Sequence, residues 1–316
     1  MAAPARVLTN DDLTRMVETS DEWITTRTGI RERRIVAPGE STSDLGAVAA
    51  REAMARAGAR PEDIDLIIFC TMTPDQVAPA TACFLQSKLG AKNAAAVDIQ
   101  AACSGFIYGL SMARGAIVSG EAACVLLVAG ESMSRFIDWT DRTTCVLFGD
   151  AAGAMVLRAS SNGRGILSTV LGADGDNAGL IGVPAGGASL PASHETVDGR
   201  LHYMKMVGAE VFKNGVRRMT RSMQKALVKA GVGVNDLDLF VPHQANKRII
   251  DAVGDSLGIS PDKVFINLEK YGNTSAASVP VALHEAVLAG RIRAGDLVGM
   301  VAFGAGLTWG ASVVRW

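Results

Sequence analysis

Short apolar runs alternate with helical patterns along most of this 316-residue chain. The runs Ile64–Cys70 and Cys124–Val128 are continuous and aliphatic, which is typical of strands buried on both faces. The stretches Ser43–Ala57 and Ala80–Leu89 are predicted to be helices, because each ends at a glycine that can terminate a helix. The remaining predicted elements are short helices from Asn10 to about Val17 and from Thr19 through Trp23, strands at Thr144–Phe148, Ala152–Leu157 and Leu237–Val241, a helix at Val281–Leu288, and a loop or lid at Gly172–Ser193.

The second part of the chain repeats the first. The matched segments keep their order and nearly their spacing, which indicates two related α/β halves. The turn-rich stretch Ser160–Gly163 marks the join, so the predicted halves are residues 1–162 and 163–316. This arrangement places Cys103 opposite the segment near Asn273. The matched pairs are Ala53–Gly58 with Ala226–Gly231, Ile64–Ile67 with Leu237–Phe240, Ser87–Gly90 with Asp255–Gly258, and the strand after Gly120 with Gly295–Val298.

Charge and cysteine content exclude several classes of function. A net charge of −1, from 31 basic and 32 acidic residues, gives no overall field for nucleic acid or a membrane surface. Five cysteines without CxxC or Cys/His ligand spacing argue against a disulfide framework and a metal site. The start of the chain lacks a signal-peptide core, and no apolar run reaches the ~18 residues of a membrane span. We therefore expect a cytoplasmic protein.

Cys103 is the first candidate for chemistry. It lies in Val97–Phe106, where a short apolar run ends in small residues and an amphipathic helix begins. The positive end of a helix dipole favours a thiolate, so a lowered pKa is expected for this thiol. The alternative is that Cys103 is a small buried hydrophobe, as we expect for the other four cysteines.

His243 and Asn273 are the second and third candidates. His243 follows the strand Leu237–Val241, at the strand end where α/β sheets bind ligands. Asn273 lies in a turn of small residues before a helix, where helix capping is a sufficient alternative role. The glycine-rich run Phe303–Leu307 can bring backbone N–H groups to a bound carbonyl, as an oxyanion hole requires.

One Cys, one His and one Asn suit two kinds of chemistry. In a Cys-His-Asn hydrolase the His is the general base. In a condensing enzyme the thiol accepts an acyl group while His and Asn hold a thioester oxygen and stabilise an enolate. The Ala- and Gly-rich surroundings favour the second, because a condensing site must exclude water. The basic cluster Arg27–Arg34 beside Trp23 fits a phosphorylated ligand with an aromatic head, such as coenzyme A, although a solvated surface is the plainer interpretation.

The motifs together resemble the β-ketoacyl-acyl-carrier-protein synthase III family of the thiolase superfamily, from Thr9 to Trp316. The resemblance implies a thiolase-like fold, in which two duplicated α/β halves form an α-β-α-β-α sandwich. The motifs that carry it are Thr19–Ile24, Arg27–Ile30, Ala102–Gly105, Phe148–Asp150, Pro242–Asn246 and Gly272–Ala276.

The resemblance also implies an activity and roles for individual residues. An acyl-CoA primer would acylate Cys103 and then condense with malonyl-acyl-carrier protein, with loss of CO₂, to begin fatty acid synthesis; acyl-CoA is a substrate and no cofactor is needed. The family is homodimeric. The implied roles are the malonyl thioester site for His243 and Asn273, the oxyanion hole for the N–H groups of Cys103 and Ala305, coenzyme A binding for Trp23, Arg27, Arg142 and Asn246, carrier-protein docking for Arg248, and the acyl pocket for Ala78 and Phe303.

Two features depart from the family pattern. Ala78 stands where members that use acetyl primers carry a bulky aromatic, which favours longer or branched primers and leaves a condensing enzyme of secondary metabolism as the alternative. The residues before Thr9 do not match the family's first strand, whose counterpart in the second half is Gly165–Gly172. We therefore expect either that the first sheet lacks one inner strand or that the start of the chain is misassigned. A non-catalytic protein that binds acyl thioesters is the competing non-enzyme hypothesis.

Overall fold

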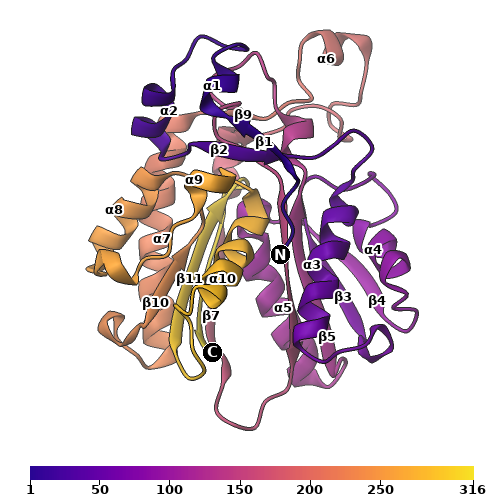
Figure 1. Cartoon of the computed structure of the whole chain (residues 1–316), viewed down its shortest axis with the longest axis vertical. Helices are drawn as coiled ribbons and strands as arrows, with labels where there is room; N and C mark the ends of the chain where they lie inside the picture. Colours follow the sequence, from indigo (N-terminus) through magenta and orange to yellow (C-terminus); the bar gives the residue numbers. More distant parts are fainter.

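A computed structural model describes all residues from Met1 to Trp316. Two four-stranded sheets form its framework, in the orders β4-β3-β5-β6 and β10-β11-β12-β7 (Figure 1). The strands are β1 (Arg6–Thr9), β2 (Glu32–Ile35), β3 (Leu66–Cys70), β4 (Ala95–Ile99), β5 (Cys124–Glu131), β6 (Ala151–Arg158), β7 (Gly165–Ala173), β8 (Ile181–Gly182), β9 (Lys205–Met206), β10 (Leu239–Pro242), β11 (Leu297–Gly304) and β12 (Thr308–Arg315). The helices are α1 (Asn10–Leu13), α2 (Asp21–Thr28), α3 (Thr42–Arg56), α4 (Thr81–Leu89), α5 (Gly105–Ser119), α6 (His194–Asp198), α7 (Gly208–Ala230), α8 (Lys247–Leu257), α9 (Leu268–Tyr271) and α10 (Ser278–Leu288).

The helices and sheets form five layers. Helices α5 and α10 occupy the middle, where α5 packs against strands of both sheets and α10 packs against β6 and β10 (Figure 1). Helices α3 and α4 cover the outer face of the first sheet, and α7 covers that of the second, with α8 packed beside it. This arrangement is the predicted α-β-α-β-α sandwich.

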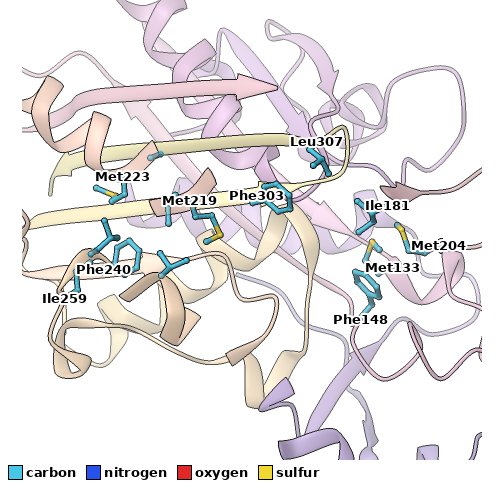
Figure 2. Packing of buried hydrophobic residues seen from close by; sticks show 14 of the residues in the cluster. Met133, Phe148, Ile181, Met204, Met219, Met223, Phe240, Ile259, Phe303 and Leu307 are labelled. Atoms are coloured by element: carbon cyan, nitrogen blue, oxygen red, sulfur yellow. The ribbon is translucent and has the colours of Figure 1, made fainter. Parts of the chain in front are cut away.

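Strands β3 and β5 show why their sequences are continuously apolar. Successive side chains of a strand point to opposite faces of a sheet, so a strand between two helical layers buries every position. Ile67 and Phe69 belong to the core beneath α3 and α4, whereas Ile68 and Cys70 belong to the core shared with α5 and α10. The second sheet has its own outer core, which extends from Met223 and Phe240 to Met133, Ile181 and Met204 (Figure 2).

The central strands of the two sheets share the same register. Strand β3 runs parallel to β5 with Leu66 opposite Val125, and β10 runs parallel to β11 with Leu239 opposite Val298. Each half then passes through a short 3₁₀ turn into its central helix. The turn is Ala102–Ser104 before α5 and Ser275–Ala277 before α10. The repeat found in the sequence is therefore a structural duplication.

The halves differ at the edges of their sheets. In the second half, β7 pairs with β12 over the length of the strand. At the equivalent edge of the first sheet, β6 pairs with Ala2 alone, through two backbone hydrogen bonds to Ala152 of 2.7 and 2.8 Å. In these residues the first sheet is thus one strand shorter than the second at this position, but the missing strand belongs to the edge of the sheet and not to its interior. Conversely, the counterpart of β4 in the second half is a single bridge between Phe240 and Val264.

Some predicted elements are wrong or misplaced. Residues 144–147 form turns rather than a strand, and Phe148 makes only an isolated bridge with Asn273. Just before them, the side chains of Asp138 and Asp141 accept backbone N–H groups two residues further on, which favours local turns. The first helix ends at Leu13 rather than near Val17. The expected loop after Gly172 includes β8, which pairs with β9. None of the helices combines the length with the apolar composition that a membrane span requires.

Candidate active site

One cavity collects most of the candidate residues. It has a volume of about 510 Å³ and extends from Cys103 at its inner end to Trp23 and Arg27 at its mouth. His243 and Phe303 reach it from the carboxyl ends of β10 and β11, where parallel strands place their ligands. The predicted site residues that line it are Trp23, Arg27, Cys103, Arg142, His243, Asn246, Arg248, Asn273 and Phe303.

Cys103 lies where the sequence predicted, but its pKa shifts in the opposite direction. The residue belongs to the 3₁₀ turn Ala102–Ser104 that leads into α5, and its side chain is buried. Burial raises the pKa of the Cys103 thiol to about 12. The prediction of a lowered pKa is therefore wrong, because desolvation of a fully enclosed sulfur outweighs the helix dipole. At rest this group is a neutral thiol.

His243 is held as a neutral hydrogen-bond donor. Its Nδ1 lies 2.6 Å from the Ser278 hydroxyl, which also accepts the backbone N–H of Gln244 at 3.3 Å. We assign the Ser278 hydroxyl as the donor to Nδ1, which places the proton of the neutral ring on Nε2. Burial lowers the pKa of His243 to about 3, so the ring carries no charge near neutrality. A neutral ring with a proton on Nε2 can donate to a carbonyl oxygen.

Asn273 is oriented by its own turn. Its side-chain oxygen accepts the backbone N–H of Ser275 at 2.8 Å, which leaves its amide N–H groups to donate into the cavity. Its backbone is fixed by hydrogen bonds with Leu147 and Gly149, so the Phe148–Asp150 motif supports the position of Asn273. His243 and Asn273 thus present N–H donors to the cavity that also contains Cys103.

Two arginines stack on one tryptophan at the mouth of the cavity. The guanidinium carbons of Arg27 and Arg142 lie 4.6 and 5.3 Å from the Trp23 ring centre. Arg142 also donates a hydrogen bond to the backbone oxygen of Glu18. The side-chain amide of Asn246 donates to the backbone oxygen of Arg27. The mouth therefore combines an aromatic surface with positive charge, as an adenine nucleotide with phosphates requires.

Only part of the predicted basic cluster belongs to this mouth. Arg33 is fully buried and donates to the backbone oxygens of Leu8 and Val146 and to the side chain of Asn10. Arg34 pairs with Glu32. These two arginines stabilise the position of β2 and do not line the cavity. The hypothesis that they bind a phosphorylated ligand together with Arg27 is therefore wrong for them.

The glycine-rich turn after β11 lies against the nucleophile. A Cβ added at Gly304 would stand 2.6 Å from the backbone nitrogen of Cys103, so only glycine fits this position. Phe303 lines the cavity, whereas Ala305 lies in the half-buried turn beyond it. Ala78 lies on an exposed loop and does not line the cavity of its own chain. Its role in the acyl pocket therefore stays a prediction.

Several residues of the site were missed by sequence reasoning. Ser278 fixes the ring of His243, and Phe212 lies 5.8 Å beneath the Arg248 guanidinium at the cavity mouth. Glu131 is a fully buried acid near the nucleophile. Its signal in the sequence was a single acid at the end of the apolar run that starts at Cys124. Ser278 carried no local signal, because its role depends on a contact with a residue 35 positions away.

Comparison with known proteins agrees with this geometry. The family described as 3-oxoacyl-[acyl-carrier-protein (ACP)] synthase III matches residues 97–175, and its C-terminal part matches residues 227–316. A beta-ketoacyl-[acyl-carrier-protein] synthase III of Symbiobacterium thermophilum is 59% identical over 100% of this chain and 96% of that protein.

Solved structures give the same result. The 3-oxoacyl-[acyl-carrier-protein] synthase III of Aquifex aeolicus is 48% identical with a TM-score of 0.93, covering 100% of this chain and 97% of that one. The priming beta-ketosynthase of the R1128 polyketide pathway is 38% identical with a TM-score of 0.91, covering 99% and 93%. The predicted thiolase-like fold is confirmed, and the chain belongs to the β-ketoacyl-acyl-carrier-protein synthase III family.

Proposed function

We propose that this chain condenses an acyl-CoA primer with malonyl-acyl-carrier protein, with loss of CO₂, and so initiates fatty acid synthesis. The observation that carries the proposal is the convergence of Cys103, His243 and Asn273 on one cavity, at whose mouth two arginines contact the Trp23 ring. Membership of the synthase III family, at 59% identity over the full chain, supports the same reaction.

The first half-reaction acylates Cys103. The adenine end of acyl-CoA stacks at Trp23, its phosphates bind Arg27 and Arg142, and Asn246 lines the path of the chain between them. The acyl carbonyl oxygen accepts the backbone N–H groups of Cys103 and Ala305 while the sulfur attacks its carbon. Coenzyme A then leaves, and the acyl chain remains on Cys103 beside Phe303.

The second half-reaction forms the carbon–carbon bond. The malonyl thioester oxygen accepts the N–H groups of His243 and Asn273, which stabilise the enolate formed when CO₂ is lost. The enolate carbon attacks the acyl group on Cys103 and releases the thiol. A buried His243 with a pKa of about 3 cannot serve as a general base near neutrality, and this argues against the hydrolase alternative.

Partners and location complete the proposal. Arg248 lies at the cavity mouth over Phe212, where a carrier protein delivering a malonyl group has to dock. A homodimer would bring the exposed loop at Ala78 of one copy to the cavity of the other. We assign the reaction to the cytoplasm, where acyl-CoA and carrier protein are both available.

Intact-protein mass spectrometry after incubation with a panel of acyl-CoAs tests this function. We expect an adduct of acyl mass on the wild type and none on Cys103→Ala, together with β-ketoacyl-carrier protein once malonyl-carrier protein is added. An unmodified protein that retains affinity for acyl-CoA would instead identify a binding protein. The chain length that reacts fastest decides between an acetyl primer and the longer or branched primers that Ala78 favours.

A further inference from the structure

Gln244 directly follows His243, but its side chain does not line the cavity. The residue is 1% exposed, so its amide has to find hydrogen-bond partners inside the protein. An apolar side chain of similar volume would be buried without this requirement. The reason for an amide at this position therefore lies in the groups that it contacts.

Every polar group of this amide has a backbone partner. Its Nε2 donates to the backbone oxygens of Pro242 and Phe265 at 2.7 and 3.2 Å, and its Oε1 accepts the backbone N–H of Asn267 at 3.0 Å. Two carbonyl oxygens and one N–H group can be satisfied by only one orientation of the amide, which assigns its nitrogen and its oxygen. Gln244 thus connects the end of β10 with the residues that precede α9.

The amide occupies the place of a missing backbone hydrogen bond. The segment beside β10 begins to pair with it, because the N–H of Phe265 donates to the oxygen of Phe240 at 2.9 Å. In a regular parallel ladder the next hydrogen bond would join the N–H of Asn267 to the oxygen of Pro242. The amide of Gln244 lies between these two groups and bonds with each of them. It therefore acts as an additional peptide group inserted between the two segments.

The first half has no such insertion. Strands β3 and β4 pair over their whole length, and the ladder continues with a hydrogen bond of 3.2 Å from the N–H of Thr71 to the oxygen of Ile99. The strand registers make Thr71 the counterpart of Gln244, and Thr71 has no amide side chain. The inserted amide is therefore specific to the half that carries His243 and Asn273.

On one side, the amide fixes the peptide bond that precedes His243. The carbonyl of this peptide belongs to Pro242 and accepts from Gln244, while its N–H donates to the backbone oxygen of Val301 at 2.8 Å. Both edges of the peptide plane are therefore held. This restraint on the main chain adds to the contact between the His243 ring and Ser278.

On the other side, the amide fixes the start of the segment that leads to Asn273. Asn267 is the N-cap of α9, and its side chain makes no capping bond but donates to Glu285 at 3.1 Å. The helix ends at Tyr271, whose hydroxyl donates to the same carboxylate at 2.8 Å. Gln244 is therefore one of the groups that set the position of α9, two residues before Asn273.

We propose that Gln244 is a positioning residue that sets the spacing between the N–H donors of His243 and Asn273. The inference rests on the proposed condensation, in which both donors bind one thioester oxygen. Donors that act together on a developing charge have to be held within about 0.5 Å of their productive positions. Gln244 lies outside the cavity and acts only through the two segments that it joins.

Acylation should be nearly independent of Gln244. In the proposed first half-reaction the acyl oxygen accepts the N–H groups of Cys103 and Ala305, which lie in the turns before α5 and after β11. None of the hydrogen bonds of the Gln244 amide reaches these turns. A positioning role therefore lowers condensation alone, whereas general support of the fold would affect both half-reactions.

Separate rapid-quench measurements of the two half-reactions test this role. Acylation of Cys103 is followed by mass spectrometry with acyl-CoA alone, and condensation is started by adding malonyl-carrier protein to the preformed acyl enzyme. Gln244→Leu removes all three hydrogen bonds of the amide. We expect its condensation rate to fall by about 100-fold, with acylation within about threefold of wild type.

Gln244→Glu is the conservative variant. A protonated Glu keeps an acceptor for Asn267 and one donor, whereas an ionised Glu would place a negative oxygen against the carbonyls of Pro242 and Phe265. Condensation by this variant should be within about tenfold of wild type at about pH 6 and fall further, relative to wild type, at about pH 9. The carboxylate of Glu285, which is linked to this site through Asn267, is present in both proteins and cancels in the comparison.

Gln86→Leu is the matched control. Its amide also donates to a backbone oxygen, that of Ala94 at 2.8 Å, but it lies in α4 and does not line the cavity, so both rates should stay at the wild-type level. The proposal is overturned if Gln244→Leu condenses within about threefold of wild type, or if it loses acylation and condensation equally.

If Gln244→Leu does not fold, the ratio of condensation to acylation in Gln244→Glu decides. A ratio within about threefold of wild type at both pH values would overturn the role of the amide. A wild-type protein that never acquires an acyl group, or whose acyl enzyme never condenses, would refute the proposed function instead.

Discussion

The two halves share one framework but divide the chemistry between them. The strand registers place Cys70 of the first half at the position of His243 in the second, and the equivalent turns place Cys103 at the position of Ala276. Strands β5 and β11 have the same length and end at Glu131 and Gly304, respectively. Each functional residue therefore has a small or non-reacting counterpart in the other half.

This division shows how a duplicated fold can build one asymmetric site. Each strand end faces the strained turn of the opposite half: Gly304 approaches the turn of Cys103, and Glu131 approaches the turn of Ser275. The contact of Gly304 requires a residue without a side chain, whereas the equivalent contact in the other half is made by the buried acid Glu131. Substitutions that change one half at a time test this division of roles, and Gly304 should be the most sensitive position.

Gly304→Ala should impair acylation most. The added methyl would stand 2.6 Å from the nitrogen and 3.1 Å from the Cβ of Cys103, so the nucleophile has to shift. We expect at least about a 100-fold lower acylation rate, because misplacement of reacting atoms by about 1 Å has that effect. Gly130→Ala is the control, since it crowds Phe69 and not the nucleophile. Similar acylation by both variants would contradict the role of Gly304.

Ser278→Ala should affect condensation more than acylation. Loss of the Ser278 hydroxyl leaves the His243 ring without its orienting partner. The equivalent position in the first half is Gly105, which has no hydroxyl. We expect the rate of condensation to fall by about 10- to 100-fold, with acylation of Cys103 within about twofold of wild type. Separate measurement of the two half-reactions checks this, and an equal loss in both would contradict it.

Glu131→Gln should change how stability depends on pH. The folded-state pKa of Glu131 is raised to about 7 from an ordinary 4.5, so the folded protein binds more protons between these values. The free energy of unfolding therefore falls as pH rises from about 4.5 to above 7, by about 3 kcal/mol at most. Denaturant unfolding of the variant should lose this slope. A slope that persists in the variant would show that Glu131 is not its source.

Arg27→Ala should have the smallest effect. It removes one of the two guanidinium groups on Trp23 and should raise the KM for acyl-CoA by about 2- to 30-fold, with little change in the rate at saturation. Arg31→Ala is the matched control, because Arg31 belongs to the same basic cluster but does not line the cavity. A comparable rise in KM for Arg31→Ala would indicate a general charge effect.

The sequence predicted features that leave local signals. The duplication, the layers and the three residues Cys103, His243 and Asn273 were predicted because each lies in a short segment with a characteristic pattern. The pKa of Cys103 was predicted in the wrong direction, because a helix dipole is visible in sequence whereas burial depends on the whole fold. Arg33 was placed in the wrong environment for the same reason. Ser278 acquires its role only through a contact with His243, 35 positions away in the sequence.

The arrangement of charge along the cavity has a consequence for how the enzyme responds to salt. Positive groups cluster around the half-buried ring of Trp23, while the imidazole and thiol further in are uncharged at neutral pH. Added electrolyte shortens the Debye length and weakens the attraction of exposed guanidinium groups for phosphate, but it has little effect on neutral dipoles shielded from solvent. A higher ionic strength should therefore lower the rate at which anionic substrates bind, whereas the rates of the chemical steps should stay the same.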